Sequence, residues 1–277
     1  MTSLITPAEL ATALAGPAAP VVLDVQYNLA GTPGRELYAE AHLPGALFAD
    51  VDVDLADPPG AGGRHPLPDL DRLQHTLRRW GLELDTPVVV YDQGSGMGSA
   101  RAWWLLLYVG MSDVRVLDGG LAQWQRDGGP VTQEVPGPPV PGTITLRPGS
   151  LPLLDAEGAA ALAQRGLLLD ARAPERFEGR TEPIDTIAGH ITGAANAPLS
   201  EFTDPRGMLK DKEALHAYFA GLGSFEHKQI GAYCGSGITA ARLALALRQI
   251  GITPAVYVGS WSEWITDPQR RVATGPA

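Results

Sequence analysis

The only cysteine of the chain, Cys234, stands between a short apolar run and a glycine-rich turn. Residues 229–233 have the composition of a buried strand, and residues 239–250 have the pattern of a helix. A glycine-rich turn between a strand and a helix directs backbone N–H groups at one point. There they and the helix dipole stabilise a thiolate, a persulfide or an oxyanion. The sequence therefore predicts that Cys234 is a reactive nucleophile, although most free cysteines are inert buried residues.

The segment around Cys234 has a counterpart in the first half of the chain, because the same landmarks occur twice in the same order. A stretch rich in proline and glycine separates the two sets of landmarks. We therefore predict two tandem domains, residues 1–130 and 151–277, joined by a linker over residues 131–150. The matched segments are 21–25 with 167–171, 41–46 with 189–194, 90–96 with 232–237, and 117–120 with 257–260.

Each half alternates short apolar or β-branched runs with segments of helical pattern. This alternation predicts an α/β fold in which each domain has a mainly parallel sheet flanked by helices. Ligands of such sheets bind at the carboxyl ends of the strands, and the turn that carries Cys234 follows such an end. The expected strands are 21–25, 88–91, 114–117, 167–169, 229–233 and 255–258, and the clearest helices are 98–109 and 239–250.

The composition is that of a globular chain that can bury a core, since 44% of its 277 residues are hydrophobic and 19% are charged. A net charge of −10 repels phosphate backbones and anionic lipid, so we expect no nucleic-acid partner and no membrane partner. One cysteine cannot form an intramolecular disulfide, and the chain lacks the Cys/His spacing of a zinc site, so no metal is expected. Residues 1–7 do not have the features of a signal peptide, and the most apolar stretch, 102–111, is too short to cross a bilayer. These features favour a reducing cytoplasm.

Residues 234–239 resemble the cysteine loop of the 3-mercaptopyruvate sulfurtransferases of the rhodanese family. The resemblance extends over nearly the whole chain and implies two rhodanese domains, of which the second is active. In the first domain Asp92 occupies the position of the cysteine, and this copy is expected to be silent because a carboxylate cannot act as a sulfur nucleophile. The other segments that carry the resemblance are 41–46, 100–104, 118–121, 170–172, 189–191 and 259–264.

The residues that follow the cysteine distinguish two sulfur donors within this family. Thiosulfate-specific members carry basic residues where this chain has Gly235 and Ser236, and a hydroxyl suits a carbonyl or an enolate better than a small dianion. The resemblance therefore implies 3-mercaptopyruvate as the donor, with thiosulfate as the alternative. The Cys234 thiolate would take the sulfur as a persulfide, release pyruvate, and pass the sulfur to cyanide or to a thiol such as that of thioredoxin. Substrate contacts are expected from Gly235, Gly237, Ile238 and Thr239.

The resemblance also implies a group that moves a proton at the site. In the family the serine of the cysteine loop is linked to a histidine and an aspartate of the first domain, and the matching residues are Ser236, His65 and Asp52. The segment 57–68 would have to reach the second domain to bring His65 there. The assignment of Asp52 competes with Asp50 and Asp54, which alternate with it along one short segment.

Two arginines are the candidates for the carboxylate of the donor, because a guanidinium matches a carboxylate with two parallel hydrogen bonds. Arg176 matches the family's substrate arginine. A second arginine is usual several residues later, where this chain reads Glu-Pro-Ile-Asp over residues 182–185, and Arg180 is the nearest substitute. A further departure is Val258, where the family usually has an aspartate that supports the neighbouring loop.

Three other functions are compatible with parts of the sequence. The turn 94–99 imitates a dinucleotide site, but its third glycine position is Ser99 and the turn aligns with the cysteine loop. A cysteine phosphatase needs an arginine six positions after the nucleophile, where this chain has Ala240. A non-enzymatic persulfide carrier is the third alternative, and multiple turnovers of mercaptopyruvate would distinguish an enzyme from it. We therefore expect a sulfurtransferase that uses no cofactor.

Overall fold

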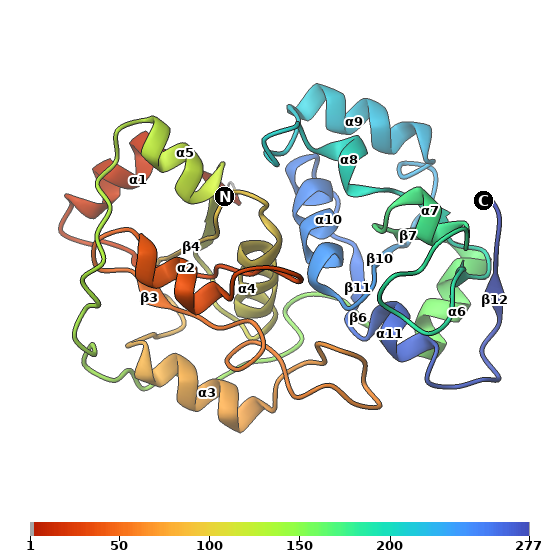
Figure 1. Cartoon of the computed structure of the whole chain (residues 1–277), viewed down its shortest axis with the longest axis horizontal. Helices are drawn as coiled ribbons and strands as arrows, with labels where there is room; N and C mark the ends of the chain where they lie inside the picture. Colours follow the sequence, from red (N-terminus) through yellow and green to blue (C-terminus); the bar gives the residue numbers. More distant parts are fainter. Residues whose placement is uncertain (1–2, 277) are drawn as a thin grey trace. The chain divides into compact units, whose positions relative to one another are not determined.

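The computed structural model describes residues 3–276, which form two compact units (Figure 1). The first unit holds residues 3–56, 68–150 and 206–208. The second unit holds residues 57–67, 151–205 and 209–276. The short segment 57–67 therefore packs with residues that follow it by more than a hundred positions, and this assignment matters for the site described below.

The first unit is a five-stranded parallel sheet with strand order β1-β5-β4-β2-β3. Its central strand β4 (Val88–Tyr91) is buried along its whole length, as expected for a parallel sheet covered on both faces. The other strands are β1 (Leu4–Ile5), β2 (Val21–Asp24), β3 (Leu47–Phe48) and β5 (Val114–Leu117). The helices are α1 (Pro7–Leu14), α2 (Gly34–Glu40), α3 (Leu70–Arg79), α4 (Met97–Tyr108) and α5 (Gly120–Arg126).

The second unit repeats this arrangement with strand order β6-β11-β10-β7-β9, again parallel throughout. A small antiparallel pair joins β8 (His190–Ile191) to β12 (Val272–Ala273). The other strands are β6 (Leu153–Leu154), β7 (Leu167–Asp170), β9 (Ala195–Asn196), β10 (Ile230–Tyr233) and β11 (Ala255–Tyr257). The helices are α6 (Ala156–Arg165), α7 (Pro174–Phe177), α8 (Leu199–Phe202), α9 (Lys212–Gly221), α10 (Ile238–Gln249) and α11 (Ser260–Trp264).

The predicted α/β class with parallel sheets is therefore confirmed in both units. The two-residue strands β1, β3, β6 and β9 were not predicted, because two residues are too few to show a periodic pattern. Local chemistry explains several helix starts. The side chains of Thr6, Asp69, Asp155 and Asp211 each accept a hydrogen bond from a backbone N–H in the first turn of the helix that follows.

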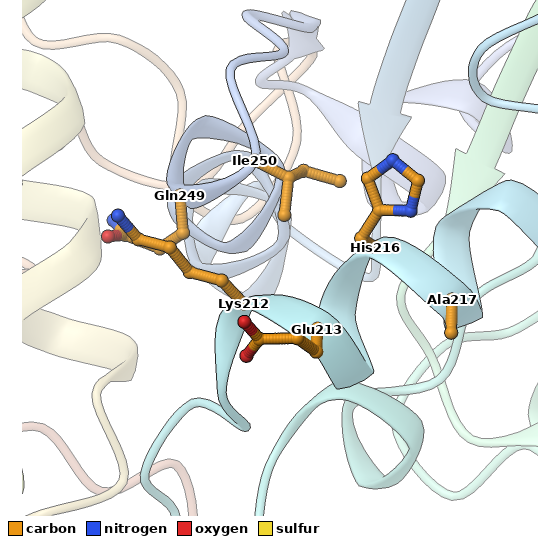
Figure 2. A pocket seen from close by; sticks show the side chains of 6 residues that line it. All are labelled: Lys212, Glu213, His216, Ala217, Gln249 and Ile250. Carbon is orange, nitrogen blue, oxygen red and sulfur yellow. The ribbon is translucent and has the colours of Figure 1, made fainter.

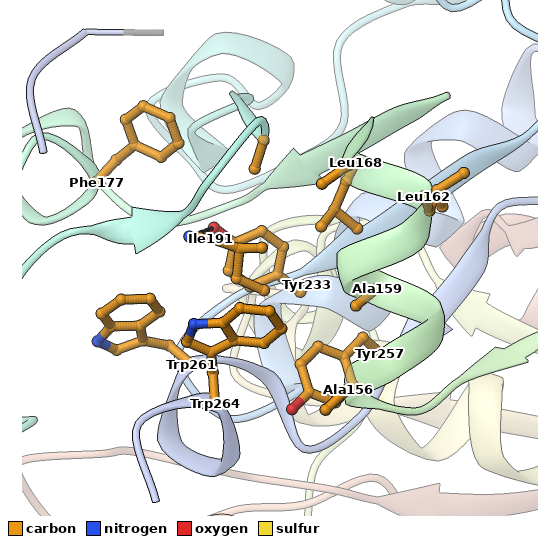
Figure 3. Close-up of a cluster of buried hydrophobic side chains, with 12 residues drawn as sticks. Ala156, Ala159, Leu162, Leu168, Phe177, Ile191, Tyr233, Tyr257, Trp261 and Trp264 are labelled. Carbon is orange, nitrogen blue, oxygen red and sulfur yellow. Dashed lines mark hydrogen bonds between the residues drawn. The ribbon is translucent and has the colours of Figure 1, made fainter. Parts of the chain in front are cut away.

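The core of the second unit supports β10, the strand that ends just before Cys234 (Figure 3). Tyr233, Trp261 and Trp264 belong to one cluster of buried side chains, and Trp261 is fully buried. The indole N–H of Trp261 donates to the carbonyl of Ile187, and that of Trp264 donates to the carbonyl of Arg271. Packing and hydrogen bonds therefore fix the turn at the start of α11, which contacts the cysteine loop.

The segment 131–150 contains no helix or regular strand and lies along the first unit. Thr132 forms an isolated bridge with His42, and the Arg78 Nε donates to the carbonyl of Ile144 at 2.9 Å. Within residues 3–276, no helix is long and apolar enough to cross a membrane.

Candidate active site

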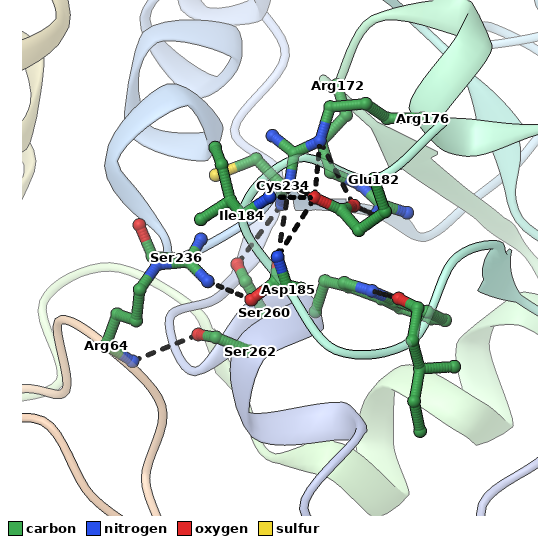
Figure 4. Close-up of polar contacts among 12 residues, drawn as sticks. Arg64, Arg172, Arg176, Glu182, Ile184, Asp185, Cys234, Ser236, Ser260 and Ser262 are labelled. Carbon is green, nitrogen blue, oxygen red and sulfur yellow. Dashed lines mark hydrogen bonds and ion pairs between the residues drawn. The ribbon is translucent and has the colours of Figure 1, made fainter. Parts of the chain in front are cut away.

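Cys234 lies directly after β10, on the turn that opens α10 (Figure 4). Its side chain is buried, and the backbone N–H of Gly237 donates to its Sγ at 3.2 Å. Gly237 has a φ of +83°, and a Cβ atom there would lie 2.4 Å from the carbonyl oxygen of Val258. Glycine is the residue that combines this left-handed conformation with such a close approach. The glycine at position 237 therefore allows its N–H group to point at the sulfur.

The first turn of α11 holds the backbone of the cysteine loop. Ser260 Oγ accepts a hydrogen bond from the Cys234 N–H at 3.1 Å and donates to the carbonyl of Tyr257 at 2.8 Å. The N–H of Trp261 donates to the carbonyl of Cys234, and that of Ser262 donates to the carbonyl of Gly235. Ser260 has a φ of 54°, the only positive φ of a non-glycine residue within residues 3–276. Such a conformation costs free energy and persists where the surroundings enforce it, often at functional sites.

The equivalent loop of the first unit is occupied by its own carboxylate. Asp92 is buried and accepts hydrogen bonds from the N–H groups of Gly94, Gly96 and Ser99, and from the Ser99 hydroxyl, at 2.9–3.2 Å. Gly120 takes the place of Ser260 and has a φ of 57°. The N–H groups that would hold a phosphate or a sulfur anion are thus already used, which argues against the dinucleotide alternative at this turn.

His65 and Ser236 lie together in the second unit although 171 positions separate them. His65 Nδ1 is 2.8 Å from Ser236 Oγ, and both side chains are buried. A hydroxyl in contact with an imidazole can pass a proton to or from a bound molecule. The pairing places Ser236 and His65 as the resemblance implies, and their catalytic role stays a prediction.

Asp52 belongs to the first unit, in the turn that follows β3. Its backbone N–H donates to the Asp50 carboxylate at 3.0 Å, and the Asp50 N–H in turn donates to the Asp54 carboxylate at 3.0 Å. These bonds link the three acidic residues of this turn. A role of Asp52 beside His65 stays a prediction, because the two residues belong to different units.

Arg176 lies in α7 and has two carboxylate partners. Its Nε and Nη2 bind Glu182 at 2.7–3.1 Å, and Nη2 also lies 3.2 Å from an oxygen of Asp185. Arg172, which is buried, holds Asp170 with two nitrogens and also contacts Glu182. Arg172 is thus a structural residue, whereas Arg176 is partly exposed and lies at the edge of the cysteine loop.

A second arginine at this edge was not predicted from the sequence. A Cβ atom on Gly235 would lie 2.9 Å from Arg64 Nη2 and 3.7 Å from both terminal nitrogens of Arg176. Arg64 also forms an ion pair with Asp185 through Nη1. Two guanidinium groups therefore lie beside Gly235, the residue next to Cys234. The one feature of the sequence that could have indicated Arg64 is its position next to His65. A segment that brings His65 to the cysteine loop also brings Arg64 there.

Arg180 does not join this pair of guanidinium groups. Its side chain is 61% exposed, and its Nε donates to Glu178 at 2.5 Å. Arg180 follows the end of α7 by three residues, and its side chain lies in solvent. The structure thus places Arg64, and not Arg180, beside Arg176.

Burial and the two guanidinium groups act in opposite directions on the carboxyl of Asp185. Burial raises the pKa of Asp185, whereas the charges of Arg64 and Arg176 lower it, and the net shift is upward.

Ile238 and Thr239 form the start of α10, with Ile238 buried against the core. Within residues 3–276, no group of three or more His, Cys, Asp or Glu side chains is arranged to hold a metal ion.

One surface pocket of the second unit lies apart from Cys234 (Figure 2). It is formed by the end of α10 and the exposed side of α9. Because α10 has 12 residues, its two ends are about 18 Å apart, and Cys234 precedes the opposite end. The lining residues are Lys212, Glu213, His216, Ala217, Gln249 and Ile250, none of which was predicted as a site residue.

Comparison with known proteins agrees with this fold. The model of the Rhodanese-like domain matches residues 6–127 and again residues 155–267. The chain belongs to the rhodanese family and contains two copies of its domain. The family and the duplication predicted from the sequence are thus confirmed.

Relatives of similar length carry names for two different sulfur donors. A Pseudomonas aeruginosa protein provisionally named a 3-mercaptopyruvate sulfurtransferase is 45% identical over 98% of this chain and 98% of its own. The SseB protein of Mycobacterium tuberculosis, provisionally named a thiosulfate sulfurtransferase, is 43% identical over 99% of this chain and 98% of its own. The crystal structure of the 3-mercaptopyruvate sulfurtransferase SseA from Escherichia coli has a TM-score of 0.82 and 29% identity, over 95% of this chain and 100% of that chain.

Proposed function

We propose that this chain is a 3-mercaptopyruvate sulfurtransferase in which Cys234 carries the transferred sulfur. The predicted enzyme class is confirmed by relatives of nearly equal length, which are named sulfurtransferases whichever donor they are named for. One observation supports the proposal most directly. The loop of Cys234 has a hydroxyl–imidazole pair, Ser236 and His65, and two guanidinium groups converge on it at Gly235.

These groups suit the chemistry of a thiol attached to an α-keto acid. The Cys234 thiolate attacks the donor sulfur, and the bond between that sulfur and carbon 3 breaks. The electron pair of the broken bond forms the enolate of pyruvate, and the sulfur stays on Cys234 as a persulfide. A proton must then reach carbon 3 to give pyruvate, and in our proposal the hydrogen-bonded pair of Ser236 and His65 transfers it. A guanidinium group binds the carboxylate, which does not react.

Thiosulfate is the second candidate donor, and the guanidinium groups at Gly235 are the observation that favours it. They supply positive charge that the cysteine loop itself lacks. However, Arg176 is paired with Glu182 and Asp185, and Arg64 with Asp185, so the charge left for a small dianion is small. Thiosulfate also has no carbonyl for the hydroxyl of Ser236. We therefore expect mercaptopyruvate to be preferred by about tenfold or more in kcat/KM.

The acceptor in our proposal is an external thiol. The chain has one cysteine, so no second thiol of its own can discharge the persulfide by forming a disulfide. A reduced protein thiol such as that of thioredoxin, or cyanide in the assay, would take the outer sulfur and restore Cys234. The need to keep Cys234 reduced between turnovers is also our reason for proposing a cytoplasmic location.

Steady-state assays with both donors and with cyanide or reduced thioredoxin test the proposal. The protein should turn over mercaptopyruvate many times, and intact-mass analysis after donor alone should show one added sulfur on Cys234. Cys234→Ser should abolish both. One transfer per chain without turnover would instead identify a persulfide carrier, and a higher kcat/KM for thiosulfate would replace the proposed donor.

A further inference from the structure

We infer that Arg64 is a donor-binding residue, and that Asp185 positions it so that Arg64 and Arg176 together hold the donor carboxylate beside Cys234. This inference rests on the function proposed above and assigns its second binding cation. It starts from the two guanidinium groups at Gly235, whose nearest nitrogens lie 2.9 Å and 3.7 Å from where a Cβ atom would be. A carboxylate held there is one residue away from the nucleophilic sulfur.

The backbone of Arg64 is fixed on the same turn that holds Cys234. Gly60 and Gly63 exchange backbone hydrogen bonds of 2.9 and 3.0 Å, which close a tight turn just before Arg64. Gly63 has a φ of +97°, and a Cβ atom there would lie 2.7 Å from the carbonyl oxygen of Gly259. The N–H of Arg64 then donates to Ser262 Oγ at 3.0 Å. The arginine therefore has a defined position relative to the cysteine loop, as a binding residue requires.

Asp185 connects the two guanidinium groups through separate oxygens. One oxygen binds Arg64 Nη1, and the other lies 3.2 Å from Arg176 Nη2. Asp185 is almost fully buried, whereas the side chains of Arg64 and Arg176 are 24% and 16% exposed. A buried carboxylate thus holds two like charges close together, which would otherwise repel each other. The free energy of this arrangement favours keeping both cations at the loop.

The bonds to Asp185 leave donors that face Gly235. Arg64 uses Nη1 for Asp185, and Nη2 is its atom nearest to Gly235. Within residues 3–276, the buried Nε of Arg64 has no hydrogen-bond partner. On Arg176 the bonds to Glu182 and Asp185 use Nε and Nη2, and Nη1 is one of the atoms near Gly235. A carboxylate can therefore bind one nitrogen of each arginine while Asp185 stays in place.

Kinetics of Arg64 variants test this assignment. Arg64→Gln should raise KM for mercaptopyruvate about tenfold or more with little change in kcat, because it removes a charged hydrogen bond from donor binding and none from the reaction. Arg64→Lys should recover part of the lost donor affinity, because lysine keeps the positive charge but lacks the bidentate geometry of a guanidinium group. Arg115→Gln is the matched control, since Arg115 is similarly exposed and pairs with Asp113 at 3.2 Å in the first unit. It should leave KM unchanged.

Asp185→Asn tests the positioning role. Asp185→Asn should also raise KM for mercaptopyruvate. The KM of the double variant with Arg64→Gln should be little higher than that of Arg64→Gln alone, because both changes remove the same cation from the loop. A lower KM in Asp185→Asn would overturn this role and show that Asp185 competes with the donor. The affinity of Cys234→Ser for pyruvate, measured by calorimetry, is a readout that needs no turnover, and Arg64→Gln should weaken it about tenfold.

The outcomes separate this inference from the proposed function. Normal turnover of mercaptopyruvate with an unchanged KM in Arg64→Gln would refute the inference and leave the function standing. Failure of the wild-type protein to turn over mercaptopyruvate would refute the function, while pyruvate binding would still decide whether Arg64 belongs to the anion site. A melting temperature equal to that of the wild type in each variant would exclude a loss of fold as the cause of a changed KM or pyruvate affinity.

Discussion

Replacing Ser236 with alanine tests the link between the cysteine loop and proton transfer. The substitution removes one oxygen, which lies 2.8 Å from His65 Nδ1 in a buried environment. The backbone of the loop is unaffected, because the bonds that hold Cys234 come from Ser260 and Gly237. Ser236→Ala therefore isolates the hydroxyl from the geometry of the nucleophile.

The size of the effect follows from what the hydroxyl does. General acid–base catalysis contributes about 10²- to 10⁴-fold, or about 2.7–5.4 kcal/mol of barrier, so kcat for mercaptopyruvate should fall by that factor. Stability should change less, by about 1–3 kcal/mol, because a buried ring nitrogen of His65 loses its serine partner. With thiosulfate the leaving group is sulfite and no carbon needs a proton, so the residual reaction with this donor should be spared.

A matched control is available in Ser224→Ala. Ser224 is another buried serine of the second unit, and its hydroxyl has no hydrogen-bond partner within residues 3–276. This control should leave both donor reactions unchanged. His65→Asn should reproduce the defect of Ser236→Ala, and the double variant should be no worse than either single one, because the two residues act as a unit.

Two results would refute this reasoning. One is a Ser236→Ala variant with unchanged kcat for mercaptopyruvate, which would remove the hydroxyl from the rate-limiting chemistry. The other is an equal loss with both donors accompanied by a lower melting temperature, which would show that Ser236 only supports the fold of the loop.

Three further predictions concern binding, the loop and pH. Arg176→Ala should raise KM for mercaptopyruvate about tenfold or more, and an unchanged KM in steady-state assays would remove this arginine from the site. Gly237→Ala should lower the free energy of unfolding, measured in urea, by more than about 1 kcal/mol, because it forces a side chain into a left-handed turn against Val258; an unchanged value would contradict the geometry. Burial raises the pKa of Asp24 to about 6, so this residue stabilises the fold below about pH 4 and the contribution is lost as the pH rises through 6. We therefore expect Asp24→Asn to remove this pH dependence. The difference in free energy of unfolding between the variant and the wild type should be up to about 3 kcal/mol more favourable to the variant at pH 8 than at pH 4. Parallel pH profiles of the two proteins would contradict this.

The fold and the position of Cys234 on a turn between a strand and a helix could be predicted because their signals are local. A strand, a glycine-rich turn and a helix follow one another within about twenty residues around Cys234, and periodicity and glycine preferences act over that range. The helix α10 begins at Ile238, one residue before the predicted start, because Gly237 already completes the turn. The duplication added a second, independent instance of each signal, which made the parallel α/β class clear in both halves.

The surroundings of the cysteine depend on contacts between distant residues. Arg64 and Asp185 are 121 positions apart, and no local pattern indicates that they form an ion pair. Arg180 was predicted from its closeness to Arg176 in sequence, but its side chain is exposed and pairs with Glu178. The sequence alone thus determined the strand, turn and helix around Cys234 and the kind of fold that carries them, because those properties are local. Only the tertiary structure decided which cations stand beside it, because side chains meet by the packing of segments and not by their order in the chain.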